Sequence, residues 1–218
     1  MSLRRKFVIP FCLIALTASL CLVSTDMAPA ESELQSEFDQ DLLENASNEF
    51  ISQFARKLMK ELIGTIDSAG TVAALSVCQQ AAPRIAESHS NFGWQISRVS
   101  DKNRNPDNRA DSVQMLLLRA FGDTASSKSD YFVQWSQQDS SIAFEYYKPI
   151  RVNNFCLKCH GGEGDIDDDV RTAVSKLYPE DKATGYSSGD LRGMFVVTVR
   201  LPEGLDYAEK LVAGDTIR

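Results

Sequence analysis

The residues best suited to chemistry are the cysteines and histidine of a Cys-x-x-Cys-His motif, at Cys156, Cys159 and His160. This spacing is the attachment signature of a c-type haem. Thioether bonds hold two edges of one porphyrin, so both sulfurs must face the same side. One helical turn places residues i, i+3 and i+4 on one face. His160 would then lie beneath the ring, where a neutral imidazole can bind iron. We therefore predict one covalently attached haem c.

Two other uses of the cysteine pair stay open at this point. A redox dithiol would use the same spacing, although it does not require the histidine that follows. A structural zinc site is the stronger alternative. Cys78, Cys156, Cys159 and one histidine would complete a Cys3His set of ligands, which zinc accepts.

Residues 1–30 are predicted to be a secretory leader. Positions 4–6 are basic, positions 7–23 are mostly apolar, and positions 28–30 read Ala-Pro-Ala, a suitable cleavage site. The apolar run is close to the lower length limit for a membrane span, so an uncleaved leader would anchor the protein to the membrane. Bacterial haem c attachment occurs outside the cytoplasmic membrane. Leader and motif therefore agree, and we expect a periplasmic protein.

The charge of the chain is acidic, with a formal net charge of −7. Nucleic-acid binding depends on neutralising phosphates, so this balance argues against a nucleic-acid partner. It is typical of a soluble protein, or of one with a basic redox partner.

Apolar residues recur at every fourth position from Leu34 to Leu62, which predicts an N-terminal helix over 31–64 that ends near Gly64. This helix could pack on its own domain or project as an arm that forms a homodimer. A second helix is predicted over 66–88, with Pro83 kinking it and Cys78 on its apolar side. We divide the chain into the leader, this N-terminal helix, and a domain over 65–218.

The remaining elements alternate between strands and helices. Residues 124–140 are predicted to be irregular because they are polar around scattered aromatic residues. Asp165 is the predicted cap of the helix that follows the motif. The expected strands are 92–99, 142–152 and 191–201, and the expected helices are 107–121, 166–177 and a segment from Asp206.

Several separated blocks of residues resemble the Tll-like single c-type haem domain family. The resemblance covers about residues 40–205 and implies an α+β, PAS-like antiparallel sheet with flanking helices. It also implies that Cys78 is the second axial ligand. The blocks are Val77-Cys78, Ala82-Pro83, Arg98, Arg104 to Asn108, Cys156 to Gly161, Tyr178 to Tyr186 and Gly189 to Gly193.

Side chains that could bind iron opposite His160 are Cys78, His89, Met59, Met115 and Met194. Among them we expect His89 to be exposed and Met194 to pack in the core, and we hypothesise Cys78/His160 ligation. A thiolate favours ferric iron and a low potential, whereas a methionine raises the potential. The arginines that could hold the haem propionates are Arg98, Arg104, Arg109 and Arg192.

The function predicted from these features is a redox or diatomic-gas sensor, and the alternative is a low-potential periplasmic electron-transfer cytochrome. A sensor would act through a separate signalling or redox protein, because the sequence contains no kinase or cyclase module. We do not expect an enzyme. A haem peroxidase needs an open distal position with an acid–base group, and the sequence indicates neither.

Overall fold

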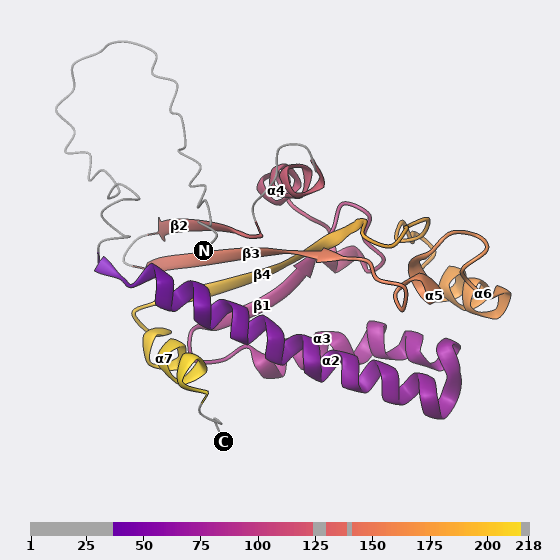
Figure 1. The fold of residues 1–218 in the computed structure, drawn as a ribbon, viewed down its shortest axis with the longest axis horizontal. Coiled ribbons are helices and arrows are strands. Elements are labelled where there is room, and N and C mark those ends of the chain that lie inside the picture. Colours follow the sequence, from indigo (N-terminus) through magenta and orange to yellow (C-terminus); the bar gives the residue numbers. More distant parts are fainter. Residues whose placement is uncertain (1–36, 124–129, 139–140, 215–218) are drawn as a thin grey trace, which may run out of the picture.

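The computed structural model describes residues 37–123, 130–138 and 141–214 of the 218-residue chain (Figure 1). The predicted leader and the first residues of the predicted N-terminal helix lie outside these ranges. The predictions of export, cleavage and membrane anchoring therefore stay predictions.

A four-stranded antiparallel sheet forms the centre of the fold, with helices on both faces (Figure 1). The order β1-β4-β3-β2 places the last strand between the first and the third. The predicted α+β, PAS-like architecture with a long N-terminal helix is confirmed. The strands are β1 Trp94–Val99, β2 Phe132–Gln138, β3 Ser141–Arg151 and β4 Leu191–Leu201.

Strand β2 is the element that the sequence did not predict. Its buried Phe132 and Trp135 are three positions apart, so they do not show the alternation typical of a strand. They pair instead across the ladder, Phe132 with Tyr147 and Trp135 with Phe144 of β3. Cross-strand aromatic contacts of this kind stabilise a strand that its own pattern does not reveal.

A helical hairpin covers one end of the sheet and places Cys78. Helix α2 spans Gln40–Ser76, but Gly70 breaks it with a φ of 85°. After Gly70 the chain turns back through the π-helix Val77–Ala81 and α3 Ala82–His89 (Figure 1). The predicted helix end at Gly64 is therefore wrong. Gly64 lies within the helix, and Gly70 makes the turn because glycine tolerates a positive φ.

Alanine substitutions at the two glycines should change stability in opposite directions. Gly70→Ala should lower the free energy of unfolding by about 1–2 kcal/mol, because alanine is strained at a positive φ. Gly64→Ala should raise it by roughly 0.5–1 kcal/mol, because a Cβ there meets nothing within 4 Å and alanine favours helix. Urea denaturation measures both. If Gly64→Ala lowered the free energy of unfolding instead, the result would indicate that the helix ends at Gly64 and not at Gly70.

The predicted irregularity at Pro83 is confirmed as a π-helix. Proline has no backbone N–H, so Pro83 cannot bond to the carbonyl of Gln79 as the i+4 residue of an α-helix would. The preceding turn widens instead, and the N–H of Ala82 bonds to the carbonyl of Val77. Cys78 therefore lies in an irregular helical turn, a feature that is frequent at functional sites.

The core has one hydrophobic cluster on each face of the sheet. Helices α2, α3 and α7 Leu205–Ala213 pack on one face, where Phe50, Phe54 and Trp94 are buried. Helix α4 Ser112–Gly122 packs on the other, around Phe121 and Met194. The first half of α2 is thus fixed to its own domain. Homodimer formation stays a prediction.

Candidate haem-binding site

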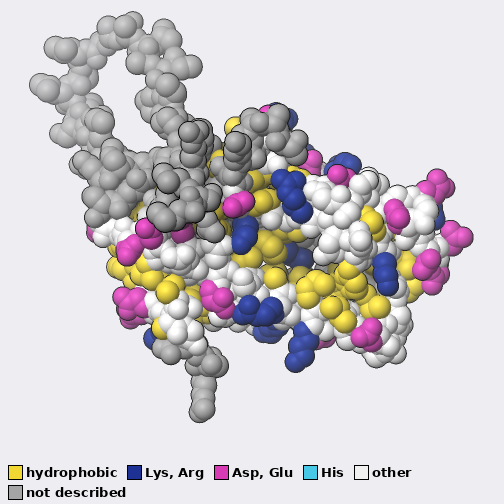
Figure 2. Space-filling view, in the orientation of Figure 1, with side chains coloured by type: hydrophobic (Ala, Val, Ile, Leu, Met, Phe, Trp, Pro, Cys, Tyr) yellow, Lys and Arg dark blue, Asp and Glu magenta, His cyan; other side chains and the backbone are white. Residues whose placement is uncertain are grey.

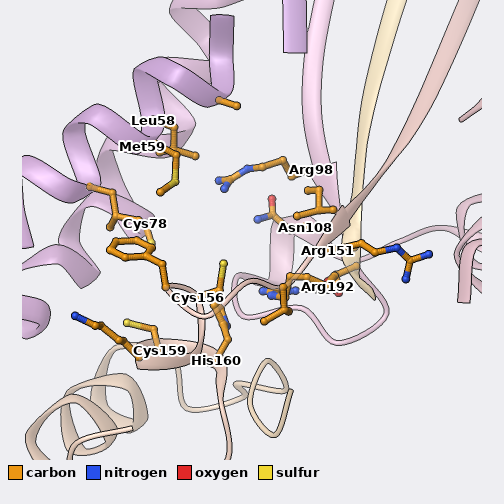
Figure 3. Close-up of a pocket in the computed structure, with 18 of the residues that line it drawn as sticks. Leu58, Met59, Cys78, Arg98, Asn108, Arg151, Cys156, Cys159, His160 and Arg192 are labelled. Atoms are coloured by element: carbon orange, nitrogen blue, oxygen red, sulfur yellow. Dashed lines mark hydrogen bonds between the residues drawn. The ribbon is translucent and has the colours of Figure 1, made fainter. Parts of the chain in front are cut away.

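The Cys-x-x-Cys-His motif forms the predicted helical turn directly after β3. The turn, α5 Leu157–His160, is closed by a 3.0 Å hydrogen bond from the His160 N–H to the Cys156 carbonyl. Cys156, Cys159 and His160 all line one cavity (Figure 3). Two thiols and an imidazole therefore face a common space, as attachment of a c-type haem requires.

Tight packing follows the motif at Gly161. A Cβ there would lie 2.7 Å from the carbonyl oxygen of Leu157 and would also collide with Asp165. Asp165 accepts a 2.8 Å hydrogen bond from the Gly162 N–H, so it closes this turn and does not cap the next helix. That helix, α6, spans Asp168–Leu177 and begins later than predicted.

The ring of His160 is oriented by a backbone contact. Nδ1 lies 2.7 Å from the carbonyl oxygen of Ala183, which can only accept, so Nδ1 carries the proton. This tautomer leaves Nε2 as the nitrogen with a lone pair for a metal. Burial, aided by the positive charges of Arg192 and Arg104, lowers the pKa of His160 to about 3 and keeps the imidazole neutral.

A buried ion pair connects the loop that contains Asp181 and Ala183 to the haem-attachment motif. Arg104 donates to both carboxylate oxygens of Asp181 at 3.0 Å and to the carbonyl of Cys159 at 2.7 Å. The two side chains are only 6% and 9% exposed. Asp181 also accepts from the N–H of Ala183, whose carbonyl orients His160. Arg104 therefore positions the motif. Its donors are used within the protein and Arg104 does not line the cavity, so of the two roles considered for it, structural arginine or propionate partner, the structure supports the structural one.

Cys78 lies on the opposite wall of the cavity, on the helical hairpin (Figure 3). Burial raises the pKa of its thiol, and the positive charges of Arg98, Arg104 and Arg192 oppose that shift. The cavity thus has a sulfur donor on the wall formed by the hairpin, apart from the wall formed by the motif. Figure 2 shows hydrophobic side chains gathered on this face of the molecule over the distal part of α2, with acidic side chains at the α6 end.

The structure sorts the other predicted iron ligands by position. Met59 of α2 lines the cavity. His89 does not, and it is not exposed as predicted. Its ring stacks on Phe50 at 4.2 Å, its Nε2 lies 2.9 Å from the Phe50 carbonyl, and burial lowers its pKa. Met194 is fully buried in the core, as predicted, and Met115 packs against the same cluster.

Two of the four predicted propionate arginines line the cavity. Arg98 extends from β1 into it (Figure 3), with its guanidinium 5.7 Å from the centre of the Phe54 ring. Arg192 also lines it and donates to Ser100 Oγ at 3.0 Å. Arg109 lies outside the cavity wall.

Several other polar residues of the cavity wall were not predicted to be part of the site. Asn108 and Arg151 line the cavity near Arg98 and Arg192. Arg151 also donates to the Phe121 carbonyl at 2.9 Å. Asn108 ends the block from Arg104 that carries the family resemblance, but the resemblance implies no role for it, and no motif marks Arg151. Only the folded chain brings the turn of Asn108 and the end of β3 to one place.

The zinc alternative requires the cysteines and a histidine to converge on a point. Within the described ranges, no group of three or more His, Cys, Asp or Glu side chains could hold a metal ion. Cys78, Cys156 and Cys159 are free thiols. Sulfurs on two walls with a space between them fit a flat ring with axial ligands better than a tetrahedral ion.

Comparison with known proteins agrees with the resemblance noted in the sequence. The sequence model of the Tll0287-like family matches residues 27–200, which include Cys78 and the whole motif. Among solved structures, the chain is similar to the crystal structure of the cyanobacterial heme-protein Tll0287, with 26% identity and a TM-score of 0.48. The match covers 70% of this chain and 94% of that one. No curated protein matches the chain.

Proposed function

Because the chain belongs to the Tll0287-like family, we propose that it is an exported c-type haem protein that senses redox state or a diatomic gas. Cys156 and Cys159 would hold one haem c, with His160 and Cys78 as its axial ligands. The observation that carries this proposal is the placement of Cys78 and His160 on opposing walls of one cavity, with both other thiols in its lining (Figure 3).

The residues of the cavity fit each part of a haem. Apolar side chains of α2, Leu58 and Leu62 among them, offer a surface for the ring. Arg98, Arg192 and Asn108 offer donors for its propionates, since guanidinium groups bind carboxylates well. When bound, the haem would supply one-electron redox chemistry and, after loss of an axial ligand, a site for a diatomic gas.

The position of Cys78 favours sensing over electron transfer. Cys78 lies in a π-helix at the base of a hairpin whose tip is exposed, rather than on a strand of the sheet. Release of Cys78 would free this turn to change conformation, and a separate signalling or redox protein would detect the change. We propose no enzymatic activity and a periplasmic location.

A serine at position 78 tests the axial ligand. Cys78→Ser should keep the covalent haem but change the absorption and electron paramagnetic resonance spectra of the ferric protein, because the thiolate donor is lost. Ser76→Ala, at the exposed Ser76 two positions earlier, is the matched control and should leave both spectra unchanged. Unchanged spectra in Cys78→Ser would remove Cys78 from the site.

Binding of carbon monoxide separates the two candidate functions. A sensor should bind the gas in its reduced form, because the axial ligand is exchangeable. A cytochrome that only transfers electrons should keep both axial ligands and exchange electrons rapidly without binding the gas. Carbon monoxide difference spectra of the reduced protein distinguish these outcomes.

A further inference from the structure

A second sulfur donor shares the wall of the cavity with Cys78. Met59 of α2 is half-buried, and its side chain is directed from α2 toward Cys78 (Figure 3). Of the methionines in the described ranges, it is the one that lines the cavity. Its neighbours in the wall, Leu58 and Leu62, are apolar and offer no competing donor.

The two sulfurs suit different oxidation states of iron. A thiolate is anionic and favours ferric iron, whereas a thioether is neutral and soft, and its ligation raises the potential by favouring ferrous iron. Methionine also has an unbranched, flexible side chain. Met59 can therefore reach different points in the cavity without movement of α2.

We infer that Met59 replaces Cys78 as the axial ligand when the haem is reduced, an inference that rests on the proposed function. One electron from an external one-electron donor enters the iron. The bond from the Cys78 sulfur breaks, and the departing thiolate takes one proton from solvent to become a thiol. A lone pair of Met59 Sδ forms the new bond. His160 keeps its position throughout.

The hairpin makes this exchange local. Met59 lies on its outgoing helix and Cys78 on its returning π-helix, and both face the motif from the same side (Figure 3). The released π-helix can change while α2 stays fixed to the sheet through Phe50 and Phe54. Met59 would also occupy the position that an incoming gas needs, so it would set how readily the reduced protein binds one.

The test compares Met59→Leu with the wild-type holoprotein, both reduced with dithionite. Resonance Raman and magnetic circular dichroism should report six-coordinate, low-spin ferrous haem in the wild type and five-coordinate, high-spin haem in the variant. Carbon monoxide should bind the variant at least about tenfold faster. In the wild type, Met59 would leave the iron for about 10% of the time or less, and the binding rate falls in proportion to that fraction. Met115→Leu, outside the cavity, should behave as wild type.

The ferric spectra separate this inference from the proposed function. Ferric wild type and Met59→Leu should give the same thiolate signature, since Cys78 is the ligand in that state. A ferrous Met59→Leu spectrum identical to wild type would overturn the exchange, and so would loss of the ferric signature in Met59→Leu. Absence of haem or of the thiolate signature from the wild type would instead contradict the proposed function.

Discussion

Replacing Cys156 and Cys159 together with alanine should leave the exported protein colourless. Both thioether bonds are lost, and a haem held only by its axial ligands and apolar contacts would not survive denaturation and purification. Absorbance in the Soret region and the mass of the intact, denatured protein measure the result. The variant should show no Soret band and no added mass of a haem.

Cys78→Ala is the control for this experiment. It removes a thiol from the same cavity but none of the attachment points, so its denatured chain should still carry one haem. Equal loss of haem from both variants would mean that the alanines disturb folding rather than attachment. Zinc in the wild-type protein in place of haem would restore the Cys3His interpretation.

The second large effect is expected from loss of the buried ion pair between Arg104 and Asp181, and it concerns the stability of the protein. Arg104→Met should lower the free energy of unfolding by about 3–5 kcal/mol, because Asp181 would stay buried without its partner. The substitution also removes the donor to the carbonyl of Cys159 and so loosens the motif. Urea denaturation of the holoprotein, followed by circular dichroism, measures the change.

Arg56→Met supplies the comparison with an exposed ion pair. Arg56 contacts Glu49 at 2.9 Å on the surface of α2, with its side chain 66% exposed. Solvent screens such a pair, so its loss should cost less than about 1 kcal/mol. If both substitutions lowered the free energy of unfolding by a similar amount, burial would not be the reason that the Arg104–Asp181 pair stabilises the protein.

The elements best predicted from the sequence are those with a strong local signal. The strand predicted over 191–201 matches β4, because its run of apolar residues is typical of a strand buried in the centre of a sheet. The turn from Cys156 to His160 was predicted from the spacing of the motif alone. Strand β2 has no such signal, because Phe132 and Trp135 depend on aromatic partners in β3. The sequence predicts the end of the helix at Gly64 and not at Gly70, because it shows where both glycines lie but not which of them adopts a positive φ.

The site was predicted in part for the same reason. The motif and the resemblance indicate which residues could contact a haem, and Cys78 and His160 do line one cavity, from the helical hairpin and from the motif turn. The role of Arg104 depends on Asp181, which is distant in sequence and close only after folding. Sequence patterns do not encode such a pair, nor the contact between Ala183 and His160.

The most direct test of the central claim is the mass of peptides from the exported wild-type protein, made in a host competent for cytochrome c maturation. After denaturation, alkylation of thiols and digestion, the peptide with Cys156 and Cys159 should carry the mass of one haem and no alkyl group. Cys78 should be alkylated. Alkylation of both Cys156 and Cys159, with no haem on the peptide, would contradict the account.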